Sequence, residues 1–349
     1  MLKHGDPAMY FDQAKGARRI LVMDLGFLGD AIHLIPALYS IRQAMPEAKL
    51  DVVISSHVTD ILKLTPWIDR VIGYQRFPKR LPWYKDLVFM ARLWRSNYDC
   101  VINFNGSDRS SRLSWATMAR LRLGRVPNKA NQRGLWKWLQ THLVREPFDE
   151  APMYIQLWNC LKKAGFPMSD PTFQVTVPEA VQKDMDLRLA DTHGFIHLSP
   201  FASMDYKEIP PTVLAEAVGR LQALYPSRPW VISCAPTERE RQKLKTFLGL
   251  LSKPPDWVFD GNLNVLQLAA LIRRSALHLG GDSGALHVAL IMDVPAVSWF
   301  RFYQDLDQWR PQGTRYLSLI GQIAPNGMVD IDANRLVEAV CAQELHFGK

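Results

Sequence analysis

The most specific chemical arrangement in the sequence is a glycine turn that carries an acid, a hydroxyl and an imidazole. Asp282 and Ser283 lie within the glycine-rich run 280–284, and His287 comes four residues after Ser283. Residues at i and i+4 share a helix face, so the hydroxyl and the imidazole can both face a ligand at the helix N-terminus. The alternative is purely structural: an N-cap followed by a core histidine.

A similar strand–turn–helix pattern occurs near the start of the chain. Asp30 follows Gly26 and Gly29, and such a turn leaves the N–H groups at the helix start free to bind an anion. The run is not GxGxxG, and no acid is placed for a ribose after the next strand, which disfavours a nicotinamide-dependent dehydrogenase. The structural alternative makes Asp30 a helix N-cap.

Two further strand-end loops carry groups suited to a nucleotide diphosphate. Ser203 and Lys207 supply a hydroxyl and an ammonium, which can follow the charge that develops on a leaving group, although a loop lysine is often merely solvated. Glu238 opens a predicted helix, where the helix dipole favours an acid. A carboxylate there could also accept hydrogen bonds from ribose hydroxyls.

These motifs sit in two successive α/β patterns. Strands are predicted at 20–25, 50–55, 70–73 and 99–105, then at 195–198, 229–233, 257–259, 277–280 and 296–299. Helical patterns separate them, so each series predicts a parallel sheet. The proline-marked stretch 166–171 divides the chain into an N-terminal domain, 1–170, and a C-terminal domain, 171–349. We expect a final helix at 333–344, capped by Asp332, which ends the second domain or crosses over to the N-terminal one.

Such domains bind ligands beyond the carboxyl ends of their strands, which predicts a cleft between the two domains. We further predict that Asp30 and Asp282 face one another across it.

Composition narrows the class of protein. Apolar residues make up 48% of 349 residues, no long apolar run appears, and the first residues do not resemble a signal peptide, so a cytoplasmic protein is expected. The four cysteines are widely spaced and suggest neither a metal site nor disulfides. A net charge of +8 implies an acidic partner: nucleic acid, an anionic membrane face or a phosphorylated substrate. No nucleic-acid motif accompanies the charge.

Several short motifs occur in one order along the chain. They are Leu28-Gly29-Asp30 with Pro36-Ala37-Leu38, Asn105-Gly106 with Arg109-Ser110, Leu268 to Ile272, and Gly281-Asp282-Ser283-Gly284 with His287 and Val294-Pro295. Together they resemble the ADP-heptose:lipopolysaccharide heptosyltransferases, glycosyltransferase family nine. The resemblance runs from about residue 19 to 313. It implies the GT-B fold, in which two Rossmann-like domains face each other across a cleft.

The resemblance also implies roles for individual residues. Asp30 would be the general base that takes a proton from the acceptor hydroxyl, with inversion at the anomeric carbon, and Lys207 would steady the departing diphosphate. The residues implied to bind the donor are Ser203, Glu238, Gly281, Asp282, Ser283, Gly284 and His287. The donor would be ADP-heptose or a similar nucleotide sugar, and neither a cofactor nor a metal is implied, because lysine and helix N–H groups can stabilise the charge.

The implied acceptor is a lipopolysaccharide-type glycan. Arg109, Arg112 and Arg120 are the first candidates for binding its phosphate or carboxylate groups. Segments 76–85 and 133–138 interleave cations with aromatic residues and could contact the inner membrane face, although solvated loops are the alternative.

Three places depart from the family pattern. Ile209 stands where a tryptophan is common. Asp24 stands where a basic or small residue is common, and residues 301–303, Arg-Phe-Tyr, replace a loop that normally approaches the donor. Arg301 could substitute for lost phosphate contacts or mark a different nucleotide sugar. The altered loop also supports the alternative of a GT-B scaffold that binds a nucleotide or a partner without catalysis.

Overall fold

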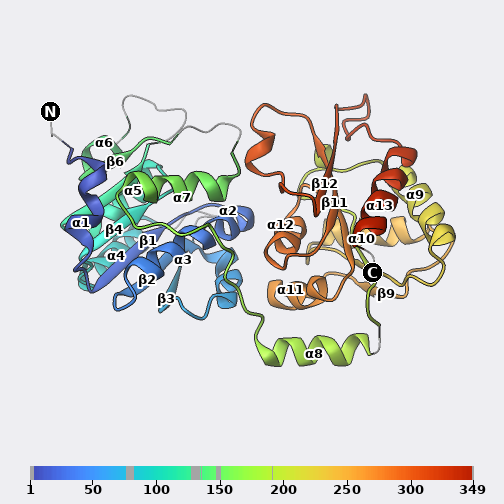
Figure 1. The fold of residues 1–349 in the computed structure, drawn as a ribbon, viewed down its shortest axis with the longest axis horizontal. Coiled ribbons are helices and arrows are strands. Elements are labelled where there is room, and N and C mark those ends of the chain that lie inside the picture. The colour runs from blue at the N-terminus through green and yellow to red at the C-terminus, as the bar shows by residue number, and fades with distance from the viewer. Residues whose placement is uncertain are drawn as a thin grey trace. The chain divides into compact units, whose positions relative to one another are not determined.

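The computed structural model describes residues 4–75, 82–126, 134, 136–146, 151–190 and 192–347. The chain divides into two compact units, Met1–Thr176 and Val177–Lys349. The boundary thus falls after Thr176, whereas the sequence analysis placed it after residue 170. Each unit contains one six-stranded parallel sheet with helices around it (Figure 1).

The first unit has the strand order β3-β2-β1-β4-β5-β6. Its strands are β1 (Arg19–Met23), β2 (Lys49–Ser55), β3 (Arg70–Tyr74), β4 (Cys100–Asn103), β5 (Leu121–Arg125) and β6 (His142–Val144). Its helices are η1 (Pro7–Met9), α1 (Tyr10–Ala14), α2 (Leu28–His33), α3 (Ile35–Ala44), η2 (Ser56–Leu64), α4 (Trp83–Arg95), α5 (Asp108–Ala116), α6 (Trp136–Leu139) and α7 (Met153–Lys163). The central strand β1 is almost wholly buried, as expected for a parallel strand with both faces covered.

The second unit has the strand order β12-β11-β10-β7-β8-β9. Its strands are β7 (Ile196–Ser199), β8 (Trp230–Ser233), β9 (Trp257–Phe259), β10 (Leu277–Gly281), β11 (Ala296–Arg301) and β12 (Tyr316–Gly321). Its helices are α8 (Glu179–Leu189), η3 (Asp205–Lys207), α9 (Pro211–Leu224), α10 (Glu238–Leu248), α11 (Val265–Arg273), α12 (Gly284–Ile291), η4 (Leu306–Gln308) and α13 (Ala333–Phe347).

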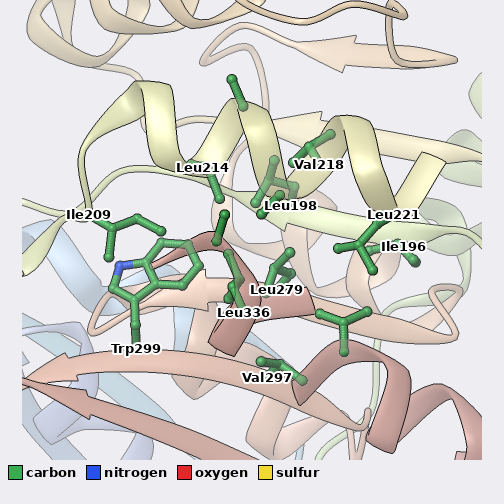
Figure 2. Packing of buried hydrophobic residues seen from close by; sticks show 14 of the residues in the cluster. Ile196, Leu198, Ile209, Leu214, Val218, Leu221, Leu279, Val297, Trp299 and Leu336 are labelled. Atoms are coloured by element: carbon green, nitrogen blue, oxygen red, sulfur yellow. The ribbon is translucent and has the colours of Figure 1, made fainter. Parts of the chain in front are cut away.

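The core of the second unit lies between its sheet and two helices. Leu214, Val218 and Leu221 recur at helical spacing along α9 and are buried against side chains of β7, β10 and β11, with Leu336 from α13 in the same cluster (Figure 2). The sequence analysis allowed α13 to cross over to the N-terminal domain. Instead it packs on α9 and on β10, β11 and β12 of its own unit, and Asp332 accepts a hydrogen bond from the Arg335 N–H as predicted.

The predicted strands are all present, but β5, β6 and β12 were not predicted. The helix after the first glycine turn also begins earlier than expected. Phe27 is the N-cap of α2, and Asp30 is its third residue, so the interpretation of Asp30 as the N-cap is wrong.

Candidate active site

The candidate residues of the first unit follow the carboxyl ends of β1 and β4. Asp30 lies in the first turn of α2, and its Oδ2 accepts a hydrogen bond from the Phe27 N–H at 2.7 Å. Gly26 makes this position possible, because a Cβ there would come within 2.3 Å of the Asp30 side chain. Asp30 is half-buried, so a partly exposed carboxylate is held in one orientation by a glycine turn.

A second carboxyl group, Asp24, is buried beside Asp30. Its Oδ1 accepts hydrogen bonds from the Gly26 N–H at 2.9 Å and from Asn105 Nδ2 at 3.3 Å. Burial, with a smaller contribution from the Asp30 charge, raises the pKa of Asp24 to about 7, against the lowering effects of both hydrogen bonds and of Arg125. Asp24 and Asp30 therefore both lie next to Gly26, and the Asp24 carboxyl group is only partly ionised at neutral pH.

The structure separates the three predicted acceptor-binding arginines. Arg109 and Arg112 lie on α5, which follows the carboxyl end of β4. Both are near Tyr74 at the carboxyl end of β3: burial and Asp86 raise the pKa of Tyr74 to about 12, and the two arginine charges oppose that rise. Arg120 directly precedes β5 and borders Asp99, at the opposite edge of the sheet. Arg120 lies apart from the other two because α5 ends at Ala116 and the chain has already turned back to the amino ends of the strands.

In the second unit, the candidate residues gather where β7, β10 and β11 end. Lys207 Nζ forms an ion pair with Asp282 Oδ2 at 2.7 Å. Asp282 follows β10, the strand that lies between β7 and β11, so the ion pair joins neighbouring strand ends. The sequence motifs around Lys207 and Asp282, which are 75 positions apart, thus form one site.

The N-terminus of α12 has the features of an anion-binding site. Ser283 is its N-cap, yet its buried Oγ makes no capping bond and has no hydrogen-bond partner among the described residues. Burial lowers the pKa of His287 to about 4, so this imidazole is neutral at pH 7. Gly281 and Gly284 flank the Asp282–Ser283 pair, and a Cβ on Gly281 would come within 2.6 Å of Trp299 Nε1. The N-terminus of α12 thus combines helix N–H groups with a hydroxyl that has no partner among the described residues.

Ser203 and Glu238 occupy more exposed positions. Ser203 lies in the exposed loop after β7, before η3. Glu238 is exposed at the start of α10, and its Oε1 accepts a hydrogen bond from Gln242 Nε2 at 2.9 Å. Both residues follow strand carboxyl ends, on the same edge of the sheet as Lys207.

The loop that carries Lys207 is fixed by a cluster of ionic contacts. Buried Glu208 accepts a hydrogen bond from Arg239 at 2.9 Å and one from Lys243 at 2.7 Å, and Asp205 pairs with the same two cations. Arg239 and Lys243 both lie on α10, so this network ties the Lys207 loop to the helix that begins with Glu238.

Arg301, at the carboxyl end of β11, is positioned by aromatic rings. Its guanidinium lies 4.5 Å from the centroid of the Tyr206 ring and 5.7 Å from that of Tyr303. Arg301 forms no side-chain hydrogen bond or ion pair with a described residue, so its N–H groups remain available. Because β11 adjoins β10, this cation stands at the strand end beside Asp282.

Sequence reasoning missed several residues of this arrangement. Asp24 was noted only as a departure from a family pattern, Arg301 as a departure that could replace lost phosphate contacts, and Tyr206 and Glu208 were not singled out. Each also has a partner far away in sequence, such as Asn105 for Asp24 and Tyr206 for Arg301, which local spacing could not have identified. Segment 76–81 and residues 133 and 135, which belong to the predicted basic-aromatic segments, lie outside the described residues. Within the described ranges no group of three potential ligands could hold a metal ion.

The fold defines the class of protein. A solved family 9 glycosyltransferase from Veillonella parvula superposes with a TM-score of 0.79 at 19% identity, covering 94% of this chain and 98% of that one. The structure described as Escherichia coli heptosyltransferase WaaC with ADP gives 0.72 at 17% identity, covering 95% and 100%. The α/β class predicted from the sequence, GT-B with two Rossmann-like domains, is confirmed.

The sequence assigns the family. Residues 87–326 match glycosyltransferase family 9 (heptosyltransferase). The lipopolysaccharide core heptosyltransferase OpsX of Haemophilus influenzae is 22% identical over 292 residues, which is 83% of this chain and 80% of that protein. The chain belongs to glycosyltransferase family 9 and is a glycosyltransferase, which sets aside the alternative of a non-catalytic scaffold.

Proposed function

We propose that this enzyme transfers a heptose, or a related sugar, from ADP-heptose or a similar nucleotide sugar to a lipopolysaccharide core-type acceptor, with inversion. The observation that carries the proposal is the Lys207–Asp282 ion pair, next to the Ser283 hydroxyl at the start of α12, which has no hydrogen-bond partner in the described part of the chain. A diphosphate fits this combination of an ammonium, helix N–H groups and a hydroxyl. The named relatives support the sugar and the acceptor.

In this mechanism Asp30 is the general base. Its carboxylate takes the proton of the acceptor hydroxyl while the hydroxyl oxygen forms a bond to the anomeric carbon of the donor. The bond from that carbon to the diphosphate breaks, and the nucleoside diphosphate leaves with the bonding electrons. Attack and departure on opposite sides invert the configuration.

The second unit stabilises the leaving group. Lys207 neutralises the charge that develops on the diphosphate, and the α12 N–H groups with Ser283 donate hydrogen bonds to it. Asp282 is then released from Lys207 to accept hydrogen bonds from the donor sugar, while Glu238 binds the ribose. We propose that Arg301 provides a second cation for the diphosphate and that the reaction requires no metal.

We place the acceptor on the first unit, with Arg109 and Arg112 bound to its anionic groups. The acceptor is attached to lipid, which implies a cytoplasmic enzyme with peripheral contact at the inner membrane face. None of the helices in the described part of the chain combines the length and apolar character needed to cross a bilayer.

The experiment is mass spectrometry of a core-oligosaccharide acceptor after incubation with ADP-heptose and the enzyme. We expect a heptose-sized gain with the wild type and a loss of at least a hundredfold in rate for Asp30→Asn, since general base catalysis contributes about 10²–10⁴-fold. Asp12→Asn, at an exposed acid on α1, is the matched control and should retain full activity. No gain with any acceptor or nucleotide sugar would refute the proposal, and full activity of Asp30→Asn would refute the assigned base.

A further inference from the structure

Helix α4 exposes an apolar surface on the side that faces away from the sheet. Trp83 is 75% exposed, Leu87 53% and Trp94 56%, and Tyr84 and Val88 are also exposed. The opposite side of the helix buries Phe89 and Leu93 in the core of the first unit. Exposed aromatic and aliphatic residues thus cover most of the outer side of this helix, which is unusual for a surface in contact only with water.

The exposed charges of α4 are all positive. Lys85, Arg92 and Arg95 are exposed and form no ion pair with any residue in the described part of the chain. The one acid of the helix, Asp86, accepts a hydrogen bond from the Tyr74 hydroxyl at 2.7 Å and is therefore directed toward the sheet. We define the α4 outer surface as these three cations with Trp83, Tyr84, Leu87, Val88 and Trp94.

The neighbouring helix, α5, and the residues that follow it also expose apolar and cationic side chains. Helix α5 packs against α4, and Trp115 and the following Met118 are exposed, as is the cationic Arg112. Tryptophan and tyrosine beside lysine and arginine are the residues that favour the interface between lipid headgroups and acyl chains. A helix of 13 residues is about 20 Å long, too short to cross a bilayer but suited to lying on one.

We propose that the α4 outer surface docks on an anionic lipid membrane. The apolar side chains enter the headgroup region, and Lys85, Arg92 and Arg95 pair with negatively charged headgroups. The chain as a whole carries a net charge of +8, which adds to its attraction to the anionic membrane. This inference rests on the surface alone and does not require the proposed sugar transfer, but it would bring the first unit to a lipid-borne acceptor.

The test is co-sedimentation of the full-length protein with phosphatidylethanolamine vesicles that contain phosphatidylglycerol, compared with vesicles of phosphatidylcholine alone. We expect binding to the anionic vesicles only, weakened by high salt. Lys85→Gln should lower the partition coefficient about fivefold, the effect of about one cation at an anionic surface. Leu87→Gln should lower it roughly tenfold through lost apolar burial.

Matched controls are available on the second unit. Lys253→Gln and Leu187→Gln change exposed residues of the same types outside the α4 outer surface, and both should bind vesicles as the wild type does. Circular dichroism and the thermal midpoint verify that each variant is folded. Transfer to a delipidated, soluble acceptor should be unchanged in Leu87→Gln, so a failure of docking is distinguishable from a failure of the proposed catalysis.

Three results would overturn the inference. The first is wild-type protein that stays in the supernatant with anionic vesicles at low salt. The second is equal binding by Leu87→Gln, Lys85→Gln and their controls. The third is a wild-type dimer that Leu87→Gln converts to a monomer without a change in vesicle binding, which would assign the surface to contact between two copies of the chain.

Discussion

Replacement of Asp24 by asparagine should stabilise the protein at alkaline pH. The folded state holds the pKa of Asp24 at about 7, whereas its ordinary value is 3.8. Between these values the folded protein keeps a proton that the unfolded chain has lost, so the stability of the wild type falls as the pH rises from about 4 to 7. The asparagine side chain carries no charge at any pH, so the substitution removes this dependence.

The magnitude follows from the two pKa values. From 3.8 to about 7 the balance between ionised and protonated forms changes about a thousandfold, which corresponds to about 4 kcal/mol. Above pH 7 we therefore expect Asp24→Asn to raise the free energy of unfolding by up to about 4 kcal/mol, with a gain close to zero at pH 4. An amide oxygen can still accept the Gly26 N–H bond.

The assay is urea denaturation of both proteins at pH 4, 6 and 8. Asp51→Asn is an informative control, because Asp51 is equally buried but its Oδ2 accepts hydrogen bonds from Arg70 at 2.8 Å and from Tyr98 at 2.7 Å. That substitution should destabilise the protein by about 1–3 kcal/mol, since it disrupts a satisfied charge pair. Parallel stability curves for Asp24→Asn and the wild type, at any offset, would show that Asp24 is ionised as in water and refute the reasoning.

Three further predictions concern other positions. Burial lowers the pKa of His278 to about 3, so stability should fall as the pH drops below 6.5, by about 2 kcal/mol for this histidine at pH 5. In thermal melts, the midpoint of His278→Gln should decrease less than that of the wild type as the pH is lowered from 6.5 to 5. Equal decreases in the two midpoints would contradict this prediction. Gly26→Ala should lower kcat at least about tenfold in the transfer assay, because its Cβ would displace Asp30, while unchanged kcat would count against that carboxylate as the base. Arg301→Lys should raise KM for the donor about tenfold with little change in kcat, since lysine lacks the planar group that stacks on Tyr206; an unaltered KM would remove Arg301 from the site.

The sequence was most informative where a strand is apolar and ends in a glycine turn. The strand at 257–259 was predicted with its observed bounds, and the turns before Asp30 and Asp282 were located correctly. Strand β5 was missed because Arg122 and Arg125 interrupt its apolar pattern. These arginines are accommodated by distant partners: Arg122 Nε donates to the Leu139 carbonyl, and Arg125 donates to Gln156 Oε1. Such partners are visible only in the folded chain.

The candidate site also depends on contacts between residues that are distant in sequence. Residue type and local spacing identified Lys207 and Asp282 separately, but their ion pair depends on β7 and β10 being neighbours. Arg120 was grouped with Arg109 and Arg112 because all three were expected near the cleft, whereas Met118, with a φ of 55°, helps to turn the chain away before Arg120. Asp24 gained its significance only from the fold, which buries it beside a second acid.

The ionic network around Glu208 supports the loop that carries Lys207, whereas Arg301 lies on a different element, β11. Arg239 and Lys243 on α10 hold Glu208, next to Lys207, in place, while Arg301 lies on β11 and stacks on the Tyr206 ring of that loop. The ion pairs of the network join Asp205 and Glu208 with Arg239 and Lys243, and none of these four pairs includes residues 301–303. Under the proposed mechanism, donor preference could therefore be redesigned at Arg301 without rebuilding the loop that we propose stabilises the leaving group.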